Sequence, residues 1–102
     1  MRFVSTRDPA ATATLSQAIR RGIAPDGGLY VPAQLPRFAP ADFDGAASLP
    51  EVAARWLAPF CAGDPLEGQL AEVVRDAFSF PAPLKRIAAA PQPLSVLELF
   101  HG

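Results

Sequence analysis

Apolar residues recur at helical spacing in three stretches of the chain, and a helix-start signal precedes each. In the first, residues 14–17 read Thr-Leu-Ser-Gln, the pattern of a capping box whose first and last side chains satisfy each other's backbone amides. Leu15, Ala18 and Ile19 then lie on one face of a helix. Gly22 suits the left-handed position that follows a helix end, so we predict a helix from residue 15 to Gly22.

The second helical stretch begins at another capping box, the Ser-Leu-Pro-Glu segment of residues 48–51. Apolar residues follow at helical spacing as Val52, Trp56, Leu57 and Phe60, and we interpret the two aromatic ones as core rather than as a base-stacking platform. Pro59 is predicted to kink or end this helix, because its ring clashes with the carbonyl four residues back.

The third stretch has the strongest helical pattern. Residues 64–67 read Asp-Pro-Leu-Glu, which places proline at the first helical position and an acid at the third. The apolar positions behind it keep helical spacing: Leu66, Leu70, Val73, Val74, Ala77 and Phe78. The Phe-Pro-Ala-Pro run of residues 80–83 is predicted to stop the helix.

Short strands are predicted between these helices. Residues 2–6 and 29–31 form the first two, and Pro32 is expected to end the second. Residues 84–88 form a strand or extended segment, and residues 94–100 have the apolar, β-branched content of a strand covered on both faces. Residues 33–47 contain two prolines and a glycine and are predicted as a loop with at most one helical turn.

These elements predict an α/β (α+β) fold in which a small sheet of short strands packs with three main helices. The chain has 102 residues, half of them apolar, which suits one domain spanning residues 1–102. Nine basic against ten acidic residues give a net charge of −1, without the basic cluster that nucleic acid or an anionic membrane surface requires.

Three further features of the sequence indicate the cellular compartment of the protein. No window approaches the roughly 18 apolar residues of a spanning helix, and the first residues lack the apolar run of a secretory signal. The single cysteine, Cys61, has no internal disulfide partner, so we expect a reduced, semi-buried thiol. These observations favour a protein of the cytoplasm that does not contact membranes.

Catalytic constellations are largely missing from the sequence. One histidine and one cysteine do not provide a clustered metal site, and a serine triad would depend on His101, the penultimate residue. Neither a GxGxxG nor a GxxxxGK[ST] phosphate loop occurs. The only lysine, Lys85, follows a proline-rich turn and is expected at the surface rather than in a Schiff base. We therefore predict no catalytic residue and no metal site within this chain.

Two carboxylates have unusual positions. Asp26 lies in the Ala-Pro-Asp-Gly-Gly turn of residues 24–28, where it can either cap local amides as an Asx-type turn residue or shape a functional rim. Glu98 lies inside an apolar run, and an ionised carboxylate there must be exposed at a sheet edge or paired.

Four segments, in order, resemble one family. The opening Met1–Thr6 is similar to an "M-x-[FY]-x-ST" start, and residues 21–32, RGIAPDGGLYVP, are similar to the "RGLAPDGGLYVP" segment of threonine synthases. Residues 78–84, FSFPAPL, look like their "F-x-FPAP" stretch, and residues 97–102 match "LELFHG". The combination and order of these segments, which span nearly the whole chain, identify it as similar to the N-terminal domain of threonine synthase.

The resemblance implies an enzyme of fold type II that uses pyridoxal phosphate. Members of that family convert O-phosphohomoserine and water into threonine and phosphate. In them "LELFHG" continues toward a Phe-Lys-Asp segment whose lysine holds the cofactor, so that lysine is expected beyond Gly102. The resemblance thus assigns the cofactor to a C-terminal part and leaves residues 1–102 without catalysis of their own.

For this chain the resemblance implies a small cap on the cofactor domains of the same protein, which is expected to be a monomer. Phe100, His101 and Gly102 are the residues expected beside substrate or cofactor. His101 would donate a proton or hydrogen bond to a phosphorylated substrate, or would hold a turn as a structural residue. Asp26, Gly27, Gly28 and Tyr30 are expected at the active-site rim or in its scaffold.

Two alternatives remain open at this stage. A related phospholyase would share the N-terminal pattern but release 2-oxobutyrate instead of threonine. A free-standing interaction domain without catalysis would need none of the missing parts. In either case the apolar final strand indicates that residues 1–102 alone have marginal stability.

Overall fold

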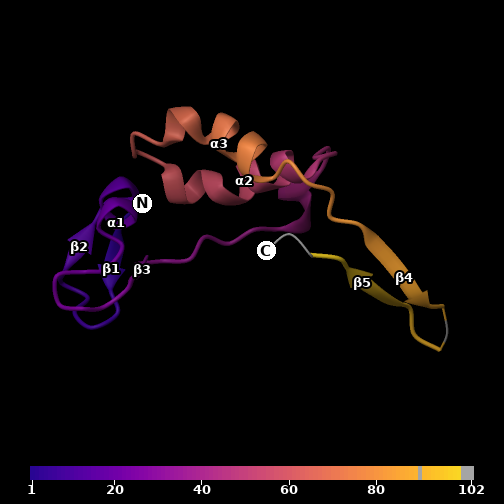
Figure 1. Ribbon diagram of the computed structural model, residues 1–102, viewed down its shortest axis with the longest axis horizontal. Helices are drawn as coiled ribbons and strands as arrows, with labels where there is room; N and C mark the ends of the chain where they lie inside the picture. The colour runs from indigo at the N-terminus through magenta and orange to yellow at the C-terminus, as the bar shows by residue number, and fades with distance from the viewer. Residues whose placement is uncertain (90, 100–102) are drawn as a thin grey trace.

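The computed structural model describes residues 1–89 and 91–99, which form three consecutive units along an elongated molecule (Figure 1). The radius of gyration is 17.1 Å, against about 13 Å for a compact domain of this length. The sheet unit contains β1 (Phe3–Ser5), β2 (Thr12–Ala13), α1 (Leu15–Arg21) and β3 (Tyr30–Pro32). The helical unit contains the 3₁₀ turn η1 (Pro40–Phe43), α2 (Leu49–Cys61), the 3₁₀ turn η2 (Glu67–Gln69) and α3 (Leu70–Ala77). The third unit, the arm, is the hairpin of β4 (Leu84–Ala88) and β5 (Leu94–Leu97).

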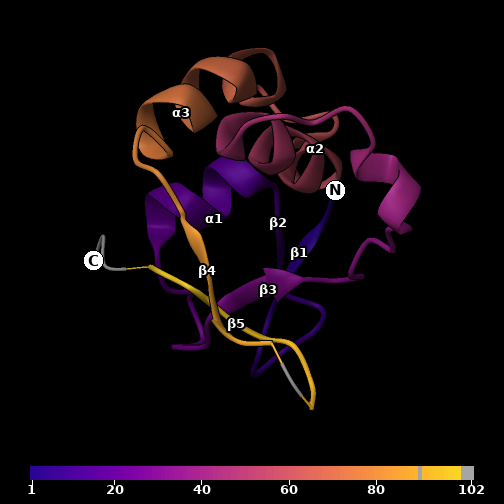
Figure 2. The same cartoon turned by 90° about the vertical axis from the view of Figure 1, so that its right-hand side faces the viewer.

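The fold is mixed α/β, as predicted, but its strands form two sheets rather than one. The sheet unit has the antiparallel order β2-β1-β3, with Phe3 opposite both Ala13 and Pro32. Phe3, Ala13 and Ala18 form a buried core there, and Phe60 of α2 packs against it. Figure 2 shows α1 beside this sheet and the helical unit beyond it. The strand predicted at residues 2–6 is confirmed as β1.

Two strands of this sheet differ from the prediction. β2 was not predicted, because Thr12 and Ala13 have no marked strand pattern and pair with β1 only through tertiary contact. The strand expected at residues 29–31 is shifted by one residue, so Pro32 belongs to β3 instead of ending it. Proline is tolerated there because β3 is an edge strand, which forms backbone hydrogen bonds with a neighbouring strand, β1, on one side only.

Both predicted capping boxes are present. The Gln17 amide donates to the Thr14 hydroxyl at 3.3 Å, and the Thr14 amide donates to the Gln17 side chain at 3.0 Å. Gly22 follows α1 with a positive φ of 70°, as a glycine after a helix end should. At α2, Ser48 and Glu51 form the same reciprocal pair. These local signals are sufficient to fix where both helices begin.

The later parts of the helical unit depart from the prediction in two places. α2 runs through Pro59 to Cys61, so the proline does not end the helix, and the kink that was the other predicted outcome stays a prediction. The α-helix expected directly after the 64–67 signal begins only at Leu70. Its first turn is 3₁₀ in character, with the Gln69 amide bonding to the Leu66 carbonyl at 3.0 Å.

The predicted loop of residues 33–47 contains the single helical turn η1 and is held by an aromatic cluster. Phe38 stacks on Trp56 of α2 with ring centroids 5.0 Å apart and an interplanar angle of 18°. Phe43 lies against both rings. The Arg55 guanidinium adds hydrogen bonds to the carbonyls of Asp42 and Asp44. Trp56 and its neighbours therefore fasten the loop to α2. Trp56 nevertheless keeps 52% of its surface exposed, so its interpretation as a core residue is wrong, whereas Phe60 packs against the core.

The arm contradicts the expectation of a covered final strand. The strand ends at Leu97 rather than at residue 100, and all four residues of β5 are exposed. β4 is confirmed at residues 84–88 and is exposed in all but Ala88. The apolar pattern identified a strand correctly, but nothing in the described part of the chain covers it.

Asp64 joins the sheet unit to the helical unit. Its side chain accepts hydrogen bonds from the Ser16 amide at 2.9 Å, from the Ser16 hydroxyl and from the Leu66 amide at 3.1 Å. One carboxylate thus serves the first turn of α1 and the turn that leads into η2. Asp64 is buried, with 7% of its surface exposed, so its charge depends on these donors.

These hydrogen bonds hold the pKa of Asp64 at about 2, below its ordinary value of 3.8, with the Ser16 hydroxyl as the largest cause.

No helix among residues 1–89 and 91–99 is both long and apolar enough to cross a membrane.

We predict that Asp64→Asn lowers the melting temperature by about 5 °C or more, because an amide NH₂ would face the donors of Ser16 and Leu66. Asp76→Asn is the matched control, since Asp76 is exposed on α3 and its substitution should leave the melting temperature within about 2 °C. Thermal unfolding followed by circular dichroism measures both. Equal melting temperatures for the two variants would show that Asp64 does not join the units.

The stability of the wild-type chain should fall as the pH drops from about 4 to about 2. The folded-state pKa of Asp64 lies below the unfolded value, so its contribution is complete above pH 3.8 and is lost as the pH falls through about 2. Urea unfolding at several pH values tests this. The Asp64→Asn chain should show a shallower acid dependence, and parallel curves for the two proteins would contradict the assignment.

Candidate functional site

The turn at residues 24–28 contains three of the four residues predicted at the rim, Asp26, Gly27 and Gly28. The Ala24 amide donates to the Gly28 carbonyl, and the Gly27 amide donates to the Ala24 carbonyl, both at 2.9 Å. Gly27 has a φ of +77°, the left-handed region that glycine adopts without strain. The turn is therefore fixed by its own backbone.

Asp26 caps this turn as an Asx-type residue. Its Oδ1 accepts from the Gly28 amide at 2.8 Å, and also from the Ser5 hydroxyl of β1 at 2.8 Å. The Gly28 and Ser5 hydrogen bonds, in that order, lower the pKa of Asp26 and keep its carboxylate ionised. The Oδ2 atom is buried and has no partner among the described residues. The local-cap interpretation is thus confirmed, and one oxygen remains available to a donor.

Residues that the sequence reasoning did not single out complete the site. Ser5 has only 1% of its surface exposed, and its hydroxyl also accepts from the Arg7 amide at 3.2 Å. The Arg7 guanidinium donates to the Asp26 carbonyl at 3.1 Å. The Thr6 hydroxyl accepts from the Leu29 amide at 3.0 Å.

The contact between Ser5, Thr6 and the turn brings together two segments that carried the family resemblance. The "ST" of the opening segment and the "DGGL" of the second segment lie about twenty residues apart in sequence and bond directly to each other. Spacing alone could not have shown this contact. The signal available in the sequence was the presence of two hydroxyl residues at the end of a predicted strand.

Gly28 is required by this close approach rather than by its backbone angle. A Cβ built on it would lie 2.1 Å from the Ser5 Oγ and 3.0 Å from the Asp26 Oδ1. Tyr30 lies at the start of β3, and its hydroxyl accepts from the Arg21 guanidinium at 3.2 Å. Asp26, Gly27, Gly28 and Tyr30 therefore share one neighbourhood, although their assignment to an active-site rim stays a prediction.

The remaining predicted site residues are Phe100, His101 and Gly102, which lie outside the described residues. Their expected position beside substrate or cofactor stays a prediction.

Lys85 and Glu98 are paired with each other on the arm. The Lys85 Nζ lies 2.8 Å from the Glu98 Oε1, with side-chain exposures of 66% and 17%. Glu98 thus meets the prediction that it must be exposed or paired. An exposed lysine engaged by a carboxylate lies in no enclosed pocket, so the described residues do not fit the covalent site that pyridoxal phosphate requires.

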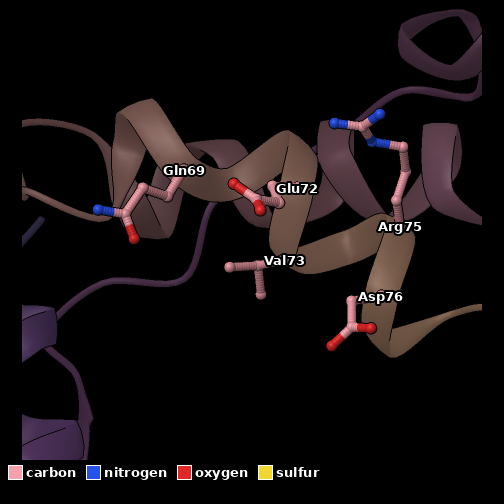
Figure 3. Close-up of a pocket in the computed structure, with 5 residues that line it drawn as sticks. All are labelled: Gln69, Glu72, Val73, Arg75 and Asp76. Atoms are coloured by element: carbon pink, nitrogen blue, oxygen red, sulfur yellow. The ribbon is translucent and has the colours of Figure 1, made fainter.

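Two hollows among the described residues are lined by side chains of different character. One of about 640 Å³ runs along η2 and α3, and Figure 3 shows its side chains all projecting from that single segment: Gln69, Glu72, Val73, Arg75 and Asp76. A second, apolar groove of about 570 Å³ lies between the sheet unit and the helical unit. Within the described residues, no group of histidine, cysteine and carboxylate side chains is arranged to hold a metal ion.

Comparison with known proteins places this geometry in a family. The family described as "Threonine synthase N terminus" matches residues 2–78. The chain is 35% identical to threonine synthase of Pseudomonas aeruginosa and 33% identical to that of Escherichia coli, in each case over 100% of this chain. It covers only 23% and 24% of those two relatives.

Two solved structures of threonine synthases match the whole of this chain. A crystal structure of threonine synthase from Escherichia coli matches with a TM-score of 0.84 at 30% identity, covering 100% of this chain and 24% of that one. An X-ray structure of pyridoxal phosphate-bound threonine synthase from Brucella melitensis matches with a TM-score of 0.82 at 37% identity, covering 100% and 23%. The chain belongs to the threonine synthase N-terminal family and spans about a quarter of the length of these relatives.

We predict that Gly28→Ala destabilises the sheet unit by about 2–3 kcal/mol, because the methyl group would collide with the Ser5 hydroxyl. Gly68→Ala is the control: a Cβ there meets nothing within 4 Å, so the substitution should leave stability unchanged or raise it by up to about 1 kcal/mol. Urea unfolding of both variants measures the difference. A Gly28→Ala chain as stable as Gly68→Ala would show that the Ser5–Asp26 contact does not constrain the turn.

Proposed function

We propose that this chain is the N-terminal part of a threonine synthase, which converts O-phosphohomoserine and water into threonine and phosphate. The observation that carries the proposal is the match of the entire chain to the first quarter of threonine synthases, one of them bound to pyridoxal phosphate. The cofactor supplies the electron sink for the reaction when bound, and the remaining part of the polypeptide holds it.

The role of residues 1–102 in this proposal is to cap the cofactor-binding part. The turn of residues 24–28 is held by Ser5, Thr6 and Arg7, so it presents a fixed surface rather than a mobile lid. Asp26, Gly27, Gly28 and Tyr30 form or support the rim of the active site. Phe100, His101 and Gly102 lead toward the substrate, with His101 either donating to its phosphate or holding a turn.

A protein with this role works in the cytoplasm as a monomer, and its partners are the phosphorylated amino-acid substrate and its own cofactor domains. Two other functions remain as outcomes of the test. One is a phospholyase that forms 2-oxobutyrate, and the other is an interaction domain without catalysis.

We expect the protein expressed from its own start codon to its own stop codon, supplied with pyridoxal phosphate and O-phosphohomoserine, to release threonine and phosphate in equal amounts. Amino-acid analysis, a phosphate assay and a 2-oxobutyrate assay on the same samples separate the three functions. A sample without substrate and one without protein are the controls. Phosphate with 2-oxobutyrate and no threonine would establish the phospholyase. No phosphate release, together with a pyridoxal phosphate absorbance that does not change on mixing, would favour the interaction domain.

A further inference from the structure

The apolar groove between the sheet unit and the helical unit has the dimensions of a small-molecule site. Its volume is about 570 Å³, and ligand sites in proteins typically measure about 300–1,000 Å³. Among the described residues no charged side chain lines it, and its ten lining residues are aliphatic or aromatic apart from one thiol. Trp56 forms one wall, and its ring is held by stacking on Phe38, so this wall exists before any ligand arrives.

The groove combines buried side chains with an exposed rim. Phe3 and Cys61 are buried, whereas Ile19, Trp56 and Val73 keep 63%, 52% and 48% of their surface exposed. These three rim residues come from α1, α2 and α3, so the groove opens to solvent where the three helices meet. Exposed apolar surface that is rimmed in this way marks binding sites in native proteins.

A second hollow, of about 320 Å³, adjoins this groove and contains a positive charge. Ile19 and Leu66 line both hollows, which makes the two neighbours along these side chains. Arg20 lines only the second hollow. Ser16 lines it too, but its hydroxyl donates to Asp64. Arg20 is therefore the side chain in this hollow that can bind an anion.

Arg20 differs from its neighbour Arg21 in having no partner. The Arg21 guanidinium donates to the Tyr30 hydroxyl at 3.2 Å. Within residues 1–89 and 91–99, Arg20 makes no hydrogen bond and no ion pair. A guanidinium presents a planar fork of donors whose geometry matches a carboxylate. A carboxylate bound there would meet a donor set that no other group engages.

The pairing of one cation with an uncharged groove distinguishes between possible occupants. A neutral apolar molecule would fill the groove and leave Arg20 unused. A peptide segment would bring backbone amides and carbonyls into a groove whose described side chains are apolar apart from the Cys61 thiol, and unpaired polar groups are costly to bury. A molecule with one carboxylate and a flexible hydrocarbon chain uses both parts of the surface.

We propose that the two adjoining hollows form a binding site for a medium-chain fatty acid. The carboxylate pairs with Arg20, and the acyl chain passes Ile19 and Leu66 into the apolar groove. Each methylene group that the groove removes from water strengthens binding about fourfold. The inference goes beyond the proposed function, because no described residue named there lines either hollow. The product assay and the binding assay can therefore succeed or fail independently.

Isothermal titration calorimetry with decanoate tests the site. The protein is expressed from its own start codon to its own stop codon, loaded with pyridoxal phosphate and titrated below the concentration at which decanoate forms micelles. We expect saturable binding. Decanoate should bind about tenfold more tightly than octanoate, because its two extra methylene groups lie in the groove.

Arg20→Gln tests the carboxylate end of the site. Because Arg20 is exposed and unpaired, the substitution should leave the melting temperature within about 2 °C and weaken decanoate binding about threefold to tenfold. Arg37→Gln is the matched control, since Arg37 is exposed in the loop before η1 and lines neither hollow. It should leave the affinity unchanged.

Val73→Asp tests the acyl end, because it places a negative charge on the rim of the groove, where we expect it to abolish decanoate binding. Leu35→Asp is its control, since Leu35 is an apolar loop residue that is 72% exposed and lines neither hollow. No saturable binding by the wild type would overturn the proposal, as would an unaltered affinity in either Arg20→Gln or Val73→Asp. A wild-type dimer that Val73→Asp dissociates would also overturn it, because a second copy would then occupy the groove.

Discussion

The structure of the first 80 residues depends on the carboxylate of Asp64. Three donors converge on it, two from Ser16 at the start of α1 and one from Leu66 at the turn before η2. Because the group is buried and charged, removing any of these donors leaves a cost that the surrounding apolar residues cannot offset. The packing of Phe60 against the core of the sheet unit adds an apolar contact beside this polar one. Together they set the position of α2 relative to the sheet.

Within residues 1–89 and 91–99, the arm contains no buried polar group comparable to Asp64. Its polar contacts, between Lys85 and Glu98 and between Glu98 and Pro83, are internal to it or to its entry. The arm also meets the helical unit, because Leu97 and Leu99 line one hollow together with Leu49 and Phe78. The exposed strands of the arm contribute to the extended shape of the molecule, whose radius of gyration is 17.1 Å.

Local signals predicted the helices well, and long-range contacts account for what was missed. The capping boxes at Thr14 and Ser48 could be predicted because the two side chains of each box lie within four residues of each other in the sequence. Asp64 was predicted as a helix start, but its main donors lie 48 residues away in Ser16. The sequence therefore did not show that Asp64 connects the sheet unit to the helical unit. Likewise Asp26 was identified as a turn cap, while its bond to Ser5 depends on strand pairing that spacing does not encode. The final strand was predicted as covered because its apolar content reveals the need for a partner but not the partner's location.

Cys61 gives this architecture a built-in reporter. It is buried at the end of α2, where desolvation and the neighbouring charge of Asp64 raise the pKa of its thiol. It also lines the apolar groove between the sheet unit and the helical unit. Because Cys61 is buried and is the single cysteine of the sequence, the rate at which a thiol reagent labels it reports local opening at the end of α2. The buried thiol thus makes this opening measurable without an introduced probe.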